Sequence, residues 1–101
     1  MIVIAGHLVL DPSKHELAVA AAREVMRETQ KEKGCISYTF SADLDEAGRF
    51  RIFEEWESAE ALALHFQAPH MAKLQQAMGG LGVREMKVQR YDVSKVGPVR
   101  P

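Results

Sequence analysis

Apolar residues occupy nearly every position from Ile2 to Leu10 and predict a strand. Both parities of this segment are apolar, and His7 is its one polar side chain. A strand with this pattern is expected to have protein on both of its faces rather than water on one.

The next segment predicts a helix from Ser13 to about Lys33. Ser13 and Glu16 have the spacing of a capping box, and Gly34 is suited to end the helix. The apolar positions recur three and four residues apart and form one stripe: Leu17, Ala18, Ala21, Ala22, Val25, Met26 and Thr29.

Two strands joined by a tight turn are predicted next. Alternating side chains indicate strands at Cys35–Asp43 and Arg49–Glu57, and the short segment 45–48 joins them as an antiparallel hairpin. One face of the second strand is expected to carry Phe50, Ile52, Glu54 and Trp56.

The remaining segment predicts two helical pieces and a last strand. Ser58 caps a helix that reaches about Gln67, and Pro69 begins a second piece that ends near Met78. Glycines then interrupt the chain before a strand at Val83–Val93. We expect residues 1–96 to form a single domain and residues 97–101 a mobile tail.

The predicted order βαββαβ folds most simply into a ferredoxin-like α+β domain, a four-stranded antiparallel sheet with its helices on one face. The other face would then expose more apolar surface than a monomer usually tolerates. At ~25 cal/mol per Å², covering several hundred Å² favours association by on the order of 10 kcal/mol before association costs. We therefore expect a homodimer.

Composition and charge argue against several classes of partner. Thirteen Lys and Arg against fourteen Asp and Glu give a net charge of -1, without a basic patch for nucleic acid. No apolar run approaches the ~20 residues that cross a bilayer, and the start of the chain lacks the features of a signal peptide. The single Cys35 is expected to be a packing residue in a reducing compartment, so we expect a cytoplasmic protein.

Three motifs resemble those of the antibiotic biosynthesis monooxygenase (ABM) superfamily. They are the strand start 34–38 (GCISY), the strand 50–58 (FRIFEEWES) and the helix junction 65–70 (HFQAPH). The resemblance extends over nearly the whole chain and implies a dimeric α+β barrel. The family includes cofactor-independent quinol monooxygenases, haem-degrading enzymes, isomerases of small phosphorylated sugars and proteins of unknown role.

The resemblance also implies a cavity between the sheet and the helices of each subunit. Strand alternation places Glu54 and Trp56 on one face, and helical spacing directs His65 toward the sheet. We expect these three side chains and His7 to converge there.

Oxygenation without a metal or flavin requires an electron-rich phenol or hydroquinone, a base and the exclusion of water. We therefore expect no cofactor, a small aromatic substrate and dioxygen as co-substrate. His65 is the preferred catalytic base and His7 the second catalytic candidate, although a histidine among apolar neighbours is also a common packing residue. The residues expected to bind the substrate are Trp56, Glu54, Tyr38, Phe66 and His70.

Neither haem nor a metal ion is expected. The resemblance places His7, His65 and about Gln76 where haem-degrading relatives carry Asn, Trp and His. His65 and His70 stand on both sides of Pro69, with no carboxylate nearby in the sequence to complete a metal site.

Two alternatives remain open. An isomerase of a small polar metabolite would need cationic groups in the cavity, such as an inward-facing Arg84 or Arg90. A non-catalytic ligand-binding or stress-response dimer would have a cavity filled by Phe, Met and Trp, and histidines bonded to the backbone.

Overall fold

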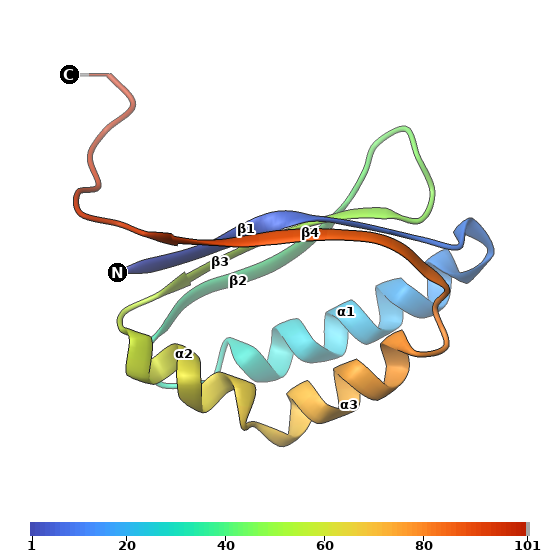
Figure 1. Cartoon of the computed structure of the whole chain (residues 1–101), viewed down its shortest axis with the longest axis horizontal. Helices are drawn as coiled ribbons and strands as arrows, with labels where there is room; N and C mark the ends of the chain where they lie inside the picture. The colour runs from blue at the N-terminus through green and yellow to red at the C-terminus, as the bar shows by residue number, and fades with distance from the viewer. Residues whose placement is uncertain (101) are drawn as a thin grey trace.

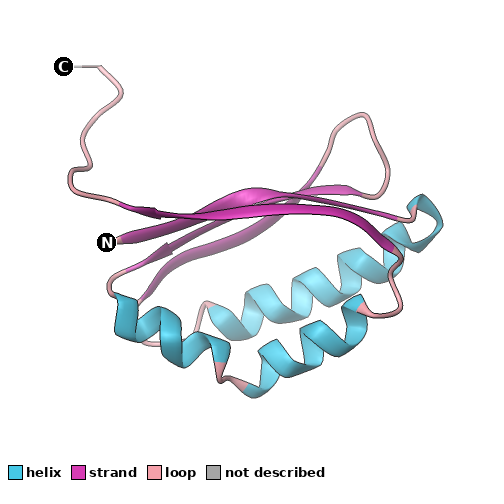
Figure 2. Ribbon diagram, in the orientation of Figure 1, coloured by secondary structure: helices cyan, strands magenta, loops and turns pink. Residues whose placement is uncertain are grey.

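The computed structural model describes residues 1–100 and has two layers, a sheet and a group of helices (Figure 1). The helices lie together against one face of the sheet, and no helix in residues 1–100 covers the other face (Figure 2). None of these helices is long and apolar enough to cross a membrane. In chain order the elements are β1 (Ile2–Leu10), η1 (Pro12–Lys14), α1 (His15–Thr29), β2 (Cys35–Ala42), β3 (Arg49–Trp56), α2 (Ala59–Phe66), α3 (Pro69–Met78) and β4 (Val83–Asp92).

The sheet has the strand order β2-β3-β1-β4, and all neighbouring strands are antiparallel. This is the ferredoxin-like arrangement predicted from the sequence, so the predicted fold class is confirmed. β1 lies in the interior of the sheet, where Ile4 is opposite Glu54 of β3 and Arg90 of β4. The edge strand β4 differs from the others, because all ten of its residues are exposed.

The alternation of β3 decides which of its side chains face the helices. Phe50, Ile52, Glu54 and Trp56 are at most 8% exposed, whereas Phe53 on the opposite face is 45% exposed. Each apolar side chain buried in this way contributes roughly 1.5–3 kcal/mol to stability. The predicted buried face of β3 is therefore confirmed.

The start and the end of α1 differ from the prediction. Asp11, not Ser13, provides the capping carboxylate, and its Oδ1 accepts hydrogen bonds from both the N–H and the hydroxyl of Ser13. A 3-10 turn forms there, so α1 begins at His15 without a side-chain cap. The helix ends at Thr29 rather than near Lys33, because a turn occupies residues 30–34. The predicted capping box is therefore wrong.

The second half of the chain agrees closely with the prediction. Ser58 Oγ accepts a hydrogen bond from the Ala61 N–H at the start of α2, and Pro69 stands in the first turn of α3. β4 ends one residue earlier than predicted. Residues 93–100 form no helix or strand. The mobility of the tail at 97–101 stays a prediction, and its last residue lies outside the described residues.

Candidate functional site

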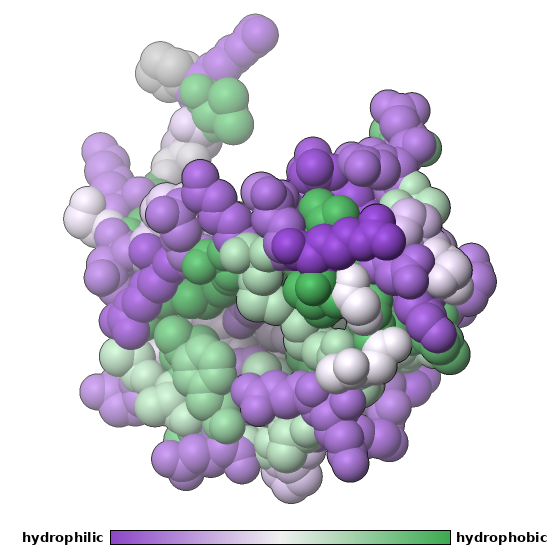
Figure 3. Space-filling model, turned by 45° about the vertical axis from the view of Figure 1, so that its right-hand side comes forward, coloured by the Kyte–Doolittle hydropathy of each residue, from purple (hydrophilic) through white to green (hydrophobic). Residues whose placement is uncertain are grey.

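A cavity of about 440 Å³ lies between the inner face of the sheet and helices α2 and α3. On the side of the molecule shown in Figure 3, a hollow is bordered by hydrophobic side chains. Among the residues of the structure that line this cavity, only Glu54 and Gln75 have a charged or amide side chain. The other lining residues are apolar or aromatic: Ile4, Leu8, Tyr38, Phe40, Ile52, Phe66, Met71, Leu74, Met78, Met86 and Val88. A molecule bound here meets one carboxyl group in apolar surroundings.

Glu54 is the carboxyl group of the cavity and is 6% exposed. Its Oε1 accepts a hydrogen bond of 2.9 Å from the indole N–H of Trp56, two residues along the same face of β3. Burial raises the pKa of Glu54 to about 7, the bond from Trp56 opposes this increase, and the negative charge of Glu32 adds to it. Glu54 can therefore take up or release a proton near neutral pH.

Tyr38 and Phe66 line the cavity at different depths. Tyr38 is 1% exposed, and Phe66 is 60% exposed. Burial raises the pKa of Tyr38, and the negative charges of Glu54 and Glu32 raise it further, so its hydroxyl stays protonated. Tyr38 is therefore suited to contact a ring or donate a hydrogen bond, but not to act as a base.

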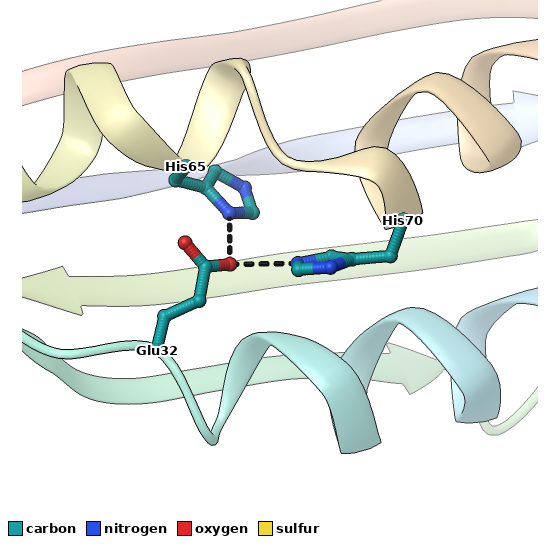
Figure 4. Close-up of side chains that lie close together, drawn as sticks. All are labelled: Glu32, His65 and His70. Carbon is teal, nitrogen blue, oxygen red and sulfur yellow. Dashed lines mark hydrogen bonds and ion pairs between the residues drawn. The ribbon is translucent and has the colours of Figure 1, made fainter.

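His65 lies behind the cavity wall and is not one of its lining residues. Its side chain is 1% exposed and packs against Trp56, with 4.7 Å between the ring centroids, and against Tyr38, with 5.4 Å. The His65 Nδ1 lies 2.7 Å from Glu32 Oε2, and the His70 Nε2 lies 2.7 Å from the same oxygen (Figure 4). One carboxylate thus joins the two histidines of the helix junction.

The turn that holds Glu32 packs closely against α2. Glu32 lies in the turn between α1 and β2, and Gly34 in that turn has a φ of 88°. A Cβ at position 34 would lie 2.5 Å from the Ala61 Cβ of α2. The close approach of this turn to α2 therefore leaves no room for a side chain at position 34, and Glu32 contacts His65 from the same turn.

The structure brings together most of the predicted site residues but not His7. Glu54 and Trp56 share the inner face of β3, and His65 packs against Trp56. His7 lies on the outer face of β1, where its Nε2 is 2.7 Å from Glu85 Oε2. The expected convergence of His7 with the other three is wrong, because its parity is opposite to that of the β1 residues that line the cavity.

Glu32 is the residue that sequence reasoning missed. No carboxylate was expected near His65 and His70, and this expectation is wrong, because Glu32 contacts both. Glu32 precedes His65 by 33 residues, so local spacing gives no sign of the contact. The signal in the sequence was Gly34, which marks a turn able to pack closely against a helix.

The cationic groups that an isomerase would need do not line the described cavity. Arg84 lies 3.9 Å from Asp11, and Arg90 donates a hydrogen bond to Asp92. Both arginine side chains are about half exposed or more. The expectation attached to the isomerase alternative is therefore not met.

The sequence of this chain is similar to those of known proteins. The family model described as antibiotic biosynthesis monooxygenase matches residues 1–77. An uncharacterized protein of Synechocystis is 31% identical over 94 residues, which make up 93% of this chain and 64% of that relative. This chain therefore spans less than two thirds of the relative's length.

Solved structures share the fold. A Deinococcus radiodurans protein, named as a candidate antibiotic biosynthesis monooxygenase, has a TM-score of 0.90 at 24% identity, with 100% of both chains covered. A Bacteroides thetaiotaomicron protein of unknown function, described as a possible oxidoreductase, has a TM-score of 0.80 at 30% identity. That match covers 89% of this chain and 94% of the other. A Mycobacterium tuberculosis protein has a TM-score of 0.82 at 26% identity, covering 96% and 97%.

Proposed function

The chain belongs to the antibiotic biosynthesis monooxygenase family, and from this premise we propose that it is a cofactor-independent monooxygenase acting on a small phenol or hydroquinone. The substrate would bind in the cavity between the sheet and helices α2 and α3. A volume of about 440 Å³ lies within the range of pockets that hold small molecules.

The observation that supports this proposal most strongly is a single buried carboxyl group in an apolar cavity. Glu54 has a pKa raised to about 7, so near neutral pH it exists in both protonation states. Oxidation of a phenol by dioxygen needs a base for the hydroxyl proton and later an acid for the departing oxygen. Glu54 replaces His65 as the base of our proposal, because Glu54 lines the cavity and His65 does not.

The proposed reaction balances without a further reactant. Glu54 takes the hydroxyl proton, the phenolate passes one electron to dioxygen, and the resulting superoxide combines with a ring carbon of the aryloxyl radical. The peroxide receives the proton from Glu54. Loss of the ring hydrogen then breaks the O–O bond and releases water. One oxygen atom enters the product quinone, the other leaves as water, and the substrate supplies all four electrons.

The other predicted residues take positioning roles in this proposal. Tyr38 and Phe66 contact the aromatic ring from the inner and the outer part of the cavity. Trp56 holds Glu54 through its indole N–H, and His65 packs against the indole ring. His70 supports this arrangement through the carboxylate that it shares with His65.

The proposal includes a homodimer of chains whose residues 1–96 form one domain. All ten residues of β4 are exposed although the strand is paired with β1. Phe53 and Tyr91 add exposed aromatic surface on the outer face of the sheet. A second copy would cover this surface, and a monomer at micromolar concentration in sedimentation experiments would contradict this part of the proposal.

Oxygen uptake by the purified full chain with a series of hydroquinones and phenols tests the reaction. Glu54→Gln should lower kcat at least about 100-fold, because the amide cannot transfer the proton. Glu55→Gln is the matched control, since Glu55 lies on the opposite face of β3 and accepts a hydrogen bond from Ser37. We expect kcat of the control within about twofold of wild type. Undiminished turnover in the Glu54→Gln variant would remove Glu54 from the mechanism.

The non-catalytic alternative predicts a different outcome of the same experiment. It expects a filled cavity and histidines bonded to the backbone, whereas the cavity is open and both His65 and His7 contact carboxylates. If a phenol binds to the wild type and to the Glu54→Gln variant with equal affinity and no oxygen is consumed, the chain is a binding protein.

A further inference from the structure

We propose that Glu32, His65 and His70 form a binding site for a divalent transition-metal ion. This site is additional to the proposed oxidation. The three residues come from separate segments, namely the turn after α1, the end of α2 and the start of α3 (Figure 4). Their potential ligand atoms all lie within 4.8 Å of one another.

The ligand set determines the class of metal. Two imidazole nitrogens and one carboxylate oxygen suit Zn²⁺, Fe²⁺ or Co²⁺, whereas Ca²⁺ and Mg²⁺ favour sites made of oxygen alone. Three protein ligands leave a fourth position for water in a tetrahedral Zn²⁺ site. Zn²⁺ is therefore the appropriate probe, and Co²⁺ is its spectroscopic substitute.

Hydrogen bonds connect the three side chains. His65 Nδ1 and His70 Nε2 both lie 2.7 Å from Glu32 Oε2, which is hydrogen-bond geometry. Zinc–ligand bonds of about 2.1 Å at tetrahedral angles would separate the ligand atoms by about 3.4 Å. Each nitrogen therefore needs to move by about 0.7 Å relative to the oxygen. Such a movement is small for Glu32, which lies in a turn and has a flexible side chain.

The three side chains are largely buried, but a route to them remains. His65 is 1% exposed, while Glu32 and His70 are 16% and 17% exposed. A second cavity of about 60 Å³ between α1 and α3 is lined in part by His70, Glu24 and Lys73. An ion could reach His70 from this second cavity and lose most of its water on binding to all three residues.

The proposed metal site is separate from the cavity in which we place the oxidation. None of its three residues lines that cavity. The indole of Trp56 packs against His65 on one side and donates a hydrogen bond to Glu54 on the other. An ion here would join α2, α3 and the turn, and its binding can be measured whether or not the chain oxidises phenols.

Calorimetric titration of the full chain with Zn²⁺, after removal of metal by a chelator, tests the site. We expect one ion per chain with a Kd below about 1 µM, a rise in Tm on adding Zn²⁺, and visible absorption bands with Co²⁺. His70→Ala and Glu32→Gln should each weaken Zn²⁺ binding at least about 100-fold. Circular dichroism reports whether each variant is folded.

His7→Ala is the matched control, because His7 contacts Glu85 at the same 2.7 Å distance but without a second histidine. Zn²⁺ binding by this control should equal that of the wild type. The proposal is overturned if the wild type binds Zn²⁺ no more tightly than the His70→Ala variant. It is also overturned if His7→Ala loses as much affinity as His70→Ala.

Discussion

The two faces of the sheet hold histidine–carboxylate pairs with equal distances and unequal surroundings. On the helix side His65 lies 2.7 Å from Glu32, and on the outer side His7 lies 2.7 Å from Glu85. The His65 side chain is 1% exposed and the His7 side chain 29%. Water can replace a partner on the outer face but not in the interior. The two pairs therefore differ in burial and not in distance.

The largest expected difference between the two faces concerns their aromatic residues. Trp56→Ala should lower the free energy of unfolding by about 3–5 kcal/mol, because it leaves a cavity beside His65 and frees Glu54 from its hydrogen bond. Phe53→Ala on the outer face should lower it by about 1 kcal/mol or less in the dissociated chain, where Phe53 is exposed. Urea denaturation of both variants measures the difference. Equal losses would mean that the outer face is as closely packed as the inner one.

The pH dependence of stability should differ between substitutions of Glu54 and Glu55, which are neighbours on β3. The pKa of Glu54 is about 7 in the folded chain, above its ordinary value of 4.5, so the folded state holds this proton more tightly than the unfolded state. The resulting stabilisation is complete below pH 4.5 and is lost as the pH rises through about 7. Relative to the Glu54→Gln variant, wild type should therefore lose about 3 kcal/mol over this range.

Urea denaturation at several pH values measures this loss. The groups near Glu54 are Trp56, which does not titrate, Glu32, and Tyr38 and Cys35, whose pKa values are raised and which stay neutral here. Glu55→Gln, on the outer face, should follow the wild-type curve. A constant difference between wild type and the Glu54→Gln variant across this range would show that Glu54 has an ordinary pKa.

The smallest expected difference concerns the carboxylates of the two histidine pairs. Glu32→Ala should lower the free energy of unfolding by about 2 kcal/mol, because the buried His65 loses its hydrogen-bond acceptor. Glu85→Ala should lower it by less than about 1 kcal/mol in the dissociated chain, since water replaces the lost partner of His7. Chelator-treated protein avoids any contribution from bound metal. An effect of equal size in both variants would contradict the argument from burial.

Sequence patterns among neighbouring residues were sufficient to predict most of the fold. The alternation of β3 and the Ser58 and Pro69 signals depend on neighbouring residues, and the structure agrees with them. The end of α1 was predicted four residues too late, because residues 30–33 are polar but not helix-breaking. In the structure these residues belong to the turn at 30–34, in which Gly34 packs closely against Ala61 of α2.

The candidate site was predictable where its residues share one strand and not where distant segments meet. Glu54 and Trp56 are two residues apart, so their common face follows from alternation. The side of His7 depends on how β1 is oriented relative to the helices, and its segment is apolar on both parities. The contact between Glu32 and His65 depends on the position of a turn against a helix, which periodicity does not reveal.

The size of the residue at position 34 bears on the turn that holds Glu32. The space between the turn and α2 admits only the Ala61 methyl group, and a methyl at position 34 would overlap it. A larger residue at position 34 would force the turn or α2 to shift, and Glu32 lies in that turn, two residues before Gly34. The turn that carries one member of this three-residue cluster is thus fitted against the helix that carries another, at a position where only glycine fits.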